Sequence, residues 1–239
     1  MDGGALFPGE PLRLCRNRPA GGRVAILGIS TVHLVAFVVT AVVVVVIPGP
    51  SVLFIVSRAL ANGRRVAVFS VLGNSAGEYV QVIAVAFGIG AIAEQSVALF
   101  TTIKLVGGLY LIYLGIKTFR ERGDMAEAMR VVSPAKSDRR AFRQGVIVGV
   151  SNPKTVVFMA AILPQFVTTT AGNVPAQILI LGLVFSLIAV LSDTMWALAA
   201  GALRTWFELS PRRLEFVGGA GGLAIAAVGA GLLATGRKP

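Results

Sequence analysis

The sequence predicts an all-α integral membrane protein with six transmembrane helices, arranged as two inverted three-helix repeats whose first and fourth helices are broken. Hydrophobic residues make up 55% of the 239-residue chain, charged residues make up 14%, and the mean hydropathy is +0.80, which ordinary soluble domains do not show. The charged residues gather between long apolar blocks, because a charge at bilayer depth costs several kcal/mol. Proline and glycine interrupt two of these blocks at matching positions.

Residues 1–27 form the first segment of the chain. They are rich in Gly, Pro and Arg and show no apolar periodicity, so we expect a disordered leader. The apolar block that follows is too long for a signal-peptide core and runs into Pro-Gly-Pro rather than a cleavage motif, so we expect it in the mature protein. Residues 28–239 are predicted to form one six-helix membrane domain.

Six apolar blocks define the predicted helices of this domain. Each is long enough to cross about 30 Å of hydrocarbon at about 1.5 Å per helical residue. The blocks are His33–Leu60, Val66–Ala93, Val97–Phe119, Phe142–Val167, Val174–Leu203 and Leu214–Ala234.

The first and fourth blocks contain residues that a helix interior does not accept without losing backbone hydrogen bonds. Pro48, Gly49 and Pro50 interrupt the first block, and Asn152, Pro153 and Lys154 interrupt the fourth. Both helices should therefore be broken, with a second half-helix beginning after each break.

Two short matches suggest an internal repeat. Pro50–Phe54 aligns with Lys154–Phe158, and Val106–Gly108 aligns with Val217–Gly219 at nearly the same separation. The predicted repeats are residues 31–119 and 142–235, joined by a loop at 120–141. Because three helices make one repeat, the second repeat must enter the membrane upside down, which is typical of secondary transporters that bind substrate near the midplane.

Connector charges predict the orientation. The positive-inside rule places the arginine-rich side in the cytoplasm, so the loop 120–141 should be cytoplasmic and both termini should lie outside, although four arginines in the leader oppose this. The connectors after the first, third and fifth blocks contain Arg64, Arg65, Arg120, Arg122, Arg130, Lys136, Arg139, Arg140, Arg143, Arg204, Arg212 and Arg213.

Composition also excludes several functions. The single cysteine, Cys15, and the single histidine, His33, cannot build a disulfide framework, a CxxC redox centre or a Cys/His metal cluster within one chain. The net charge of +11 lies in short connectors, where it reports orientation rather than nucleic-acid binding. We expect no metal, no cofactor and no nucleic-acid partner.

The helix breaks suggest a binding site for a carboxylate. A half-helix that begins at Ser51 or Thr155 exposes unpaired backbone N–H groups and a positive dipole end, and Lys154 adds a full charge. The alternative is that Pro and Gly only shape the helices and that Lys154 pairs with an internal acid. The candidate substrate-binding residues are Pro48, Gly49, Pro50, Ser51, Asn152, Pro153, Lys154 and Thr155.

Two acids, Glu78 and Asp193, lie inside predicted spans. Asn74, Glu78 and Gln81 recur at helical spacing, so this stripe should face protein or water rather than lipid. Either acid can receive a substrate ammonium group or carry a coupling proton, and Asn74 and Gln81 belong to the same candidate group. The alternative for each acid is a structural ion pair with Lys154 or Lys104.

The chain resembles the LysE/RhtB family of amino-acid exporters from Val32 to Leu233. The likeness rests on the order and spacing of several short segments. These are Pro48-Gly49-Pro50, Lys104–Gly115, Phe142-Arg143-Gln144-Gly145, Asn152-Pro153-Lys154 and Leu163-Pro164-Gln165-Phe166.

The resemblance implies a multi-pass protein of the bacterial inner membrane that exports amino acids or close derivatives, is not an enzyme and uses no nucleotide or prosthetic group. Its expected partners are an amino-acid substrate, the lipid bilayer and protons of the proton-motive force, with a homo-oligomer left open. Asp193 matches an acid that is often seen in the fifth span of the family. Glu78 has no counterpart in the family pattern, and Ala199 and Ala200 replace a Tyr of some relatives.

Three other functions compete with amino-acid export. An intramembrane enzyme is disfavoured because the sequence has no HExxH motif, no Ser/His pairing and no paired aspartates in adjacent spans. Export of a metal cation is disfavoured by the shortage of Cys, His and clustered carboxylates. A non-transporting membrane protein, such as a scaffold, would not require two matching helix breaks with polar residues at membrane depth.

Overall fold

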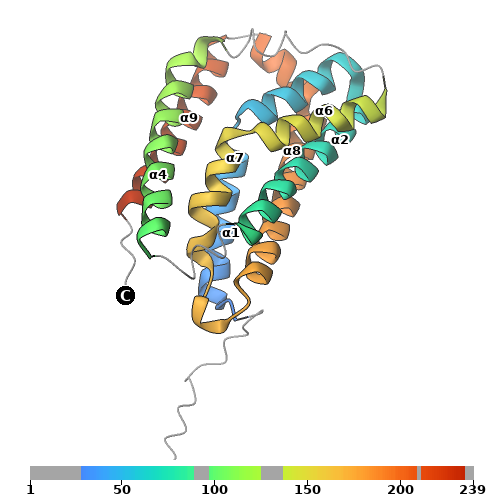
Figure 1. Ribbon diagram of the computed structural model, residues 1–239. Helices are drawn as coiled ribbons and strands as arrows, with labels where there is room; N and C mark the ends of the chain where they lie inside the picture. The colour runs from blue at the N-terminus through green and yellow to red at the C-terminus, as the bar shows by residue number, and fades with distance from the viewer. Residues whose placement is uncertain (1–27, 89–96, 125–136, 209–210, 235–239) are drawn as a thin grey trace, which may run out of the picture.

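The computed structural model describes residues 28–88, 97–124, 137–208 and 211–234, and every regular element within these ranges is helical (Figure 1). The predicted leader at 1–27 lies outside the described residues, as does most of the predicted loop. The elements are α1 (Thr31–Val46), α2 (Pro50–Phe87), α4 (Val97–Arg120), η1 (Glu121–Asp124), α6 (Asp138–Ser151), α7 (Pro153–Val157), η2 (Phe158–Ile162), η3 (Leu163–Phe166), η4 (Thr169–Ala171), α8 (Val174–Glu208) and α9 (Pro211–Ala234).

Both predicted helix breaks are confirmed. Helix α1 meets α2 at 53° across the Pro-Gly step, and α6 meets the segment Pro153–Phe166 at 47° across Asn152. Pro50 and Pro153 each stand in the first turn of the helix that follows, where a missing N–H costs no helical hydrogen bond. The prolines therefore end one half-helix and begin the next.

Helix α2 is two helices joined at Gly63. Gly63 has φ +82°, a left-handed conformation that glycine adopts without the clash of a Cβ atom. This position separates the first apolar block from the second, as the sequence predicts. The segment that follows the first break is therefore short and ends at Gly63.

Length and hydropathy identify two candidate membrane spans in the described residues, Thr101–Gly123 and Val174–Ala200. The number rises to four if each of the two bent helix pairs forms one span. Gly218–Ala234 in α9 is a shorter apolar helix. The described residues are thus all-helical in their regular structure, with apolar helices suited to several crossings of a membrane.

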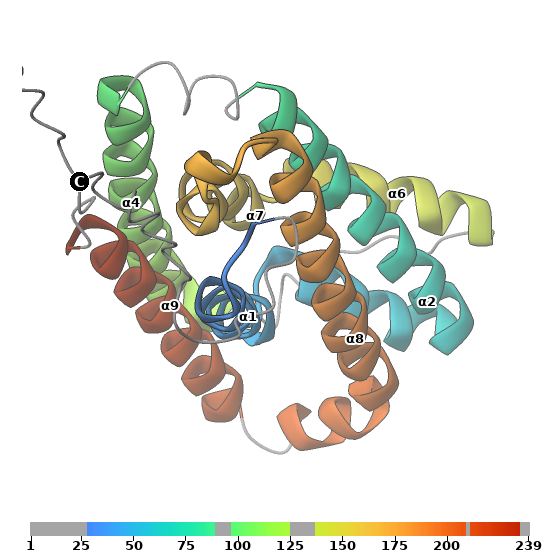
Figure 2. The ribbon, with the colours of Figure 1, turned by 90° about the horizontal axis from the view of Figure 1, so that it is seen from below.

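Three layers of helices are visible in the fold. Helix α2 packs along both α6 and α8, α4 packs along α9, and α1 and α7 lie between these two groups (Figures 1 and 2). A buried aromatic cluster joins α1 and η2, the continuation of α7, to α8. The ring of Phe158 in η2 lies 6.0 Å from that of Phe37 in α1 and 4.8 Å from that of Phe185 in α8. The apolar core therefore holds α1 and the segment Pro153–Phe166, which we call the α7 segment, between the other helices.

Glycine allows α2 and α6 to approach closely. A Cβ atom on Gly73 would lie 2.1 Å from the carbonyl oxygen of Phe142, and one on Gly149 would lie 2.1 Å from that of Asn74. Gly77 and Gly145 make equally close approaches across the same interface. The two helices therefore share a Gly-xxx-Gly contact on each side, a pattern that favours close helix packing in membranes.

Helices α4 and α9 form a second close glycine contact. Gly115 faces Gly222, where an added Cβ would lie 2.5 Å from a backbone oxygen, and Gly108 faces Gly229. Both contacts let the backbones of α4 and α9 approach closely. Gly107 points elsewhere, against Ala161 of η2.

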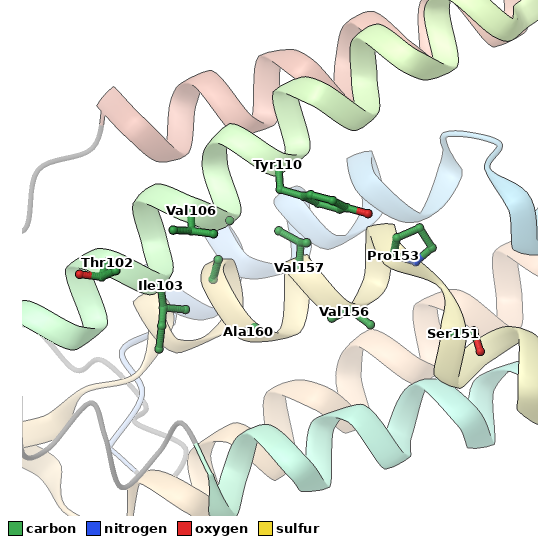
Figure 3. A pocket seen from close by; sticks show the side chains of 11 residues that line it. Thr102, Ile103, Val106, Tyr110, Ser151, Pro153, Val156, Val157 and Ala160 are labelled. Carbon is green, nitrogen blue, oxygen red and sulfur yellow. The ribbon is translucent and has the colours of Figure 1, made fainter.

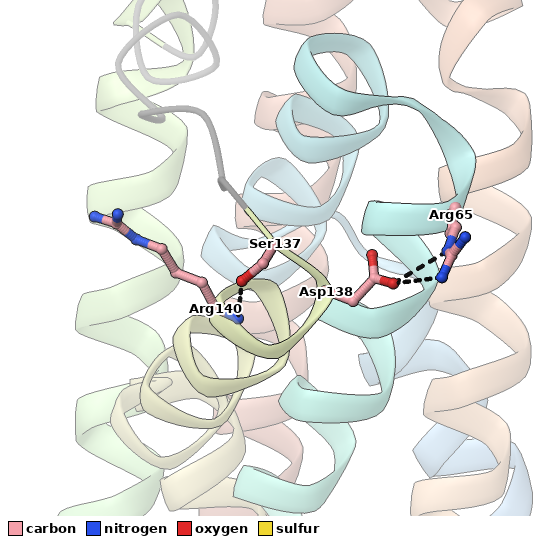
Figure 4. A network of polar contacts seen from close by, with 4 residues as sticks. All are labelled: Arg65, Ser137, Asp138 and Arg140. Atoms are coloured by element: carbon pink, nitrogen blue, oxygen red, sulfur yellow. Dashed lines mark hydrogen bonds and ion pairs between the residues drawn. The ribbon is translucent and has the colours of Figure 1, made fainter.

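The N-terminal end of α6 is bound to α2 near Gly63 (Figure 4). The Ser137 hydroxyl accepts a hydrogen bond from the backbone N–H of Arg140 and caps the helix. Arg65 forms an ion pair with Asp138 at 2.8 Å, but the Arg65 side chain is 81% exposed, so the pair adds little stability. It orients the first turn of α6 beside the turn that follows Gly63.

Candidate functional site

The two helix breaks touch each other. The side-chain amide of Asn152 donates to the Ser51 hydroxyl at 2.7 Å, and its oxygen accepts from the backbone N–H of Lys154 at 3.2 Å. Ser51, Asn152 and Lys154 are all buried. The first contact joins residues that are 101 positions apart, so the structure brings the two predicted break sites together.

Lys154 is directed at the end of α1. Its ammonium group donates to the carbonyl oxygens of Val44 and Ile47, both at 2.9 Å, and so pairs with the negative end of that half-helix. A Cβ atom on Gly49 would lie 3.5 Å from this ammonium, so the glycine leaves room for it. The sequence predicts this charge beside the N-terminus of a half-helix. In the structure, two of the three N–H groups of the ammonium instead donate to carbonyl groups at the C-terminus of α1.

The first turn of α2 is less well capped. Gly49 stands at the N-cap with an extended backbone and provides no side-chain acceptor, and Pro50 has no N–H. Within the described chain, the backbone N–H groups of Ser51 and Val52 form no hydrogen bond. This buried helix end therefore retains donor capacity and partial positive charge.

A buried pair of carboxylates lies beside the second break. The side-chain amide nitrogen of Asn74 donates to Glu78 Oε1 and to Asp193 Oδ2, both at 3.2 Å. The Thr155 hydroxyl donates to Glu78 Oε1 at 3.3 Å. These side chains come from helices α2, α7 and α8. We call the two acids, Glu78 and Asp193, the carboxylate pair.

The carboxylate pair is deeply buried and incompletely hydrogen-bonded. The exposed fractions of Asn74, Glu78 and Asp193 are 0%, 4% and 5%. Glu78 Oε2 and Asn74 Oδ1 have no hydrogen-bond partner in the described residues. Because buried polar atoms are nearly always paired, these two atoms mark a place where a proton, a water molecule or a ligand is expected.

The ion pair considered as an alternative for the two acids is absent from the described residues. Neither carboxylate of the pair lies within 4.0 Å of the ammonium group of Lys154 or Lys104. The polar stripe predicted on the second span is confirmed as buried against protein. The acids are thus held by a neutral amide and a hydroxyl group.

Gln81 has a different place from the other members of its predicted group. Its side-chain nitrogen donates to the carbonyl oxygens of Gly149 and Val150, at 2.8 and 2.9 Å, near the end of α6. Lys154 and Gln81 therefore have similar roles at the two breaks, because each donates to carbonyl groups at the C-terminal end of the interrupted half-helix. The two breaks resemble each other in this respect.

Sequence reasoning missed one buried charge, Arg58. This side chain is 2% exposed, donates to the Gln144 side chain at 2.8 Å and lies over the ring of Phe54 at 5.1 Å. The signal was available, because Arg58 stands inside an apolar block with an aromatic residue four positions earlier. It joins the first half of α2 to α6 on the side of Gly63.

An open pocket of about 540 Å³ lies apart from these polar groups (Figure 3). Tyr110 and Val106 of α4 face Val156 and Val157 of the α7 segment across it, and Pro153 is the one predicted site residue in its lining. Neither member of the carboxylate pair borders the pocket. A mostly apolar surface of this kind suits lipid or side-chain contact and offers hydroxyl groups but no charged partner to a ligand.

Comparison with known proteins gives a consistent picture. The model of a family described as LysE type translocator matches residues 42–236. The homoserine/homoserine lactone efflux protein of Salmonella typhimurium is 30% identical over 202 residues, covering 84% of this chain and 96% of that protein. The uncharacterized membrane protein YrhP of Bacillus subtilis is 33% identical, covering 66% of this chain and 78% of that protein.

A third relative is the leucine efflux protein of an Enterobacter species, which is 26% identical over 76% of this chain and 85% of that protein. No solved structure matches the chain.

Proposed function

Since the chain belongs to the LysE type translocator family, we propose that it is a secondary transporter that exports amino acids or close derivatives from a bacterial cell, driven by the proton-motive force. The observation that carries this proposal is the meeting of two broken helices beside a buried, incompletely paired pair of carboxylates. Discontinuous helices at corresponding positions are where secondary transporters bind substrates and coupling ions. Two relatives carry the names of efflux proteins for homoserine, homoserine lactone and leucine.

The carboxylate pair is the proposed site for the substrate's ammonium group. Homoserine, homoserine lactone and leucine all have a primary α-amino group, whereas the lactone has no free carboxylate. A group common to all three is therefore the better anchor. A carboxylate, where the substrate has one, is proposed to lie near the N–H groups of Ser51 and Val52 and the first turn of α7 at Thr155.

The proposed arrangement in the membrane has six spans in the inner membrane, two inverted repeats and both termini outside. The 53° and 47° breaks at corresponding places support the repeat, and the arginine-rich connectors support the orientation. Reporter enzymes fused within residues 120–141 test the orientation. A fusion there that is active only on the outer side of the membrane would contradict it.

Release of individual amino acids from peptide-fed cells tests the function. Cells that express the chain should release one or more amino acids faster than cells with an empty vector, because internal hydrolysis of the peptides loads the exporter. Collapse of the proton-motive force should slow this release. If no amino acid left the cells faster on expression, amino-acid export would be the wrong function.

Replacement of Lys154 is expected to impair export more than protein abundance. Lys154→Met leaves the carbonyl groups of Val44 and Ile47 without their donor, at about 1–3 kcal/mol, and removes a positive charge near the carboxylate pair. Lys154→Arg keeps the charge with a different geometry and should fall between. Export rates divided by the amount of protein in the membrane measure this, and normal export by Lys154→Met would exclude a transport role for this lysine.

A further inference from the structure

The carboxylate pair consists of two acids that share one neutral donor. Both Glu78 and Asp193 accept from the same nitrogen of Asn74, and the second donor, Thr155, also goes to Glu78. Two buried carboxylates in this position repel each other when both are ionised. One added positive charge between them removes that repulsion.

The charged residues around the two acids do not neutralise both of them, so one more positive charge has to come from a proton or a ligand. The group that acts on both carboxylates from a neighbouring helix is Lys154 of α7, whose ammonium donates to carbonyl oxygens of α1. The charged residues of α6 lie in its first two turns, Asp138 to Arg143, far along the helix from the contact of Gly149 with Asn74. With both acids ionised, the two acids and Lys154 carry a net charge of −1, which is costly in a buried place.

The unpaired acceptor atoms at the carboxylate pair fit either of two kinds of donor. A protonated carboxyl group supplies one O–H donor, and a primary ammonium group supplies three N–H donors. The available acceptors come from Glu78 Oε2, Asn74 Oδ1 and Asp193, which together can receive three donors. Asn74 is fully buried, and its unpaired oxygen provides an acceptor that is not acidic.

We infer that one proton and the α-ammonium group of the substrate are alternative occupants of the carboxylate pair Glu78–Asp193, so that one proton enters the cell for each substrate molecule that leaves. This rests on the proposed export of amino acids and specifies its coupling. When the ammonium group arrives from the cytoplasm, the carboxyl O–H breaks and its proton passes to cytoplasmic water. After the ammonium group leaves on the outside, one carboxylate takes a proton from external water.

The same inference defines which part of the substrate is recognised. N-acetylation removes the positive charge and two of the three N–H donors of the amino group while keeping the carboxylate. N-acetylhomoserine should therefore fail to compete with homoserine, and N-acetylleucine should fail to compete with leucine. Homoserine lactone keeps its ammonium group and should compete.

Proton release on binding tests the exchange directly. Purified full-length protein in weakly buffered detergent is titrated with homoserine and with leucine, over a series of pH values, while a pH indicator records protons. We expect up to one proton released per bound molecule, and an apparent affinity that weakens by up to tenfold for each unit of falling pH, which is the limit for one competing proton. Glu78→Gln should bind without releasing a proton, while Glu121→Gln, an exposed matched control, should behave as the wild type.

The outcomes separate the two proposals. Binding by the wild type with no proton release and no change of affinity with pH would overturn the shared site, whether or not Glu78→Gln folds. Equal competition by the N-acetyl derivatives would also overturn it. Failure of every amino acid to leave peptide-fed cells faster would instead contradict the proposed function itself.

Discussion

Asp193→Asn is expected to abolish most amino-acid export while leaving the protein folded in the membrane. Asparagine has nearly the same size as aspartate, and its side-chain oxygen can still accept from the Asn74 amide at the position now 3.2 Å away. What is lost is the negative charge, and with it the proposed charge-assisted hydrogen bond to the substrate, of about 1.5–3 kcal/mol. This corresponds to a loss of affinity of about one to two orders of magnitude.

Export in peptide-fed cells measures this effect after normalisation to the amount of protein in the membrane. Glu121→Gln makes the same chemical change at an exposed carboxylate and should export as the wild type. Size-exclusion profiles of both variants in detergent show whether the fold is kept. Normal export by Asp193→Asn would mean that Asp193 is an ordinary buried polar residue.

Gly149→Ala is expected to have the largest effect on stability. Its Cβ atom would lie 2.1 Å from the backbone oxygen of Asn74, so α2 and α6 would have to move apart. Overpacking of this kind costs about 1–3 kcal/mol where neighbours can adjust, and a backbone atom adjusts less than a side chain. The same movement would displace Asn74, the donor to both acids, so export should fall together with stability.

A second glycine provides the control for Gly149→Ala. An added Cβ on Gly231 of α9 meets no atom within 4 Å, so Gly231→Ala should leave the melting temperature unchanged or slightly higher. Thermal unfolding of the two purified variants in the same detergent measures the difference. A Gly149→Ala protein that melts with the wild type would show that α2 and α6 do not pack as closely as described.

The broken helices could be predicted because their cause is local. Proline removes an N–H wherever the chain folds, so Pro50 and Pro153 mark the breaks from the sequence alone, although the half-helices begin at these prolines rather than at Ser51 and Thr155. The stripe Asn74, Glu78 and Gln81 was also predictable, because helical periodicity places these residues on one face and a membrane excludes such a face from lipid. The prediction that they lie buried is confirmed.

The partners of these residues could not be predicted, because they depend on the rotation and depth of neighbouring helices. Nothing near Lys154 in the sequence points to the carbonyl groups of Val44 and Ile47, which lie 110 and 107 positions away. Likewise, Asn74 shows no sign in the sequence of its contact with Asp193, 119 positions away. The close approach of α2 and α6 at Gly73 and Gly149 could not be predicted either, because it depends on which helices are neighbours.

The contacts between the two breaks have a mechanical consequence. Asn152 donates to Ser51 at the start of α2, and Lys154 donates to carbonyl groups at the end of α1, so the second break is bonded to the chain on both sides of the first. Bending at the first break would stretch the hydrogen bonds that join it to the second. Moving the two broken helices apart would therefore require the loss of several hydrogen bonds at once.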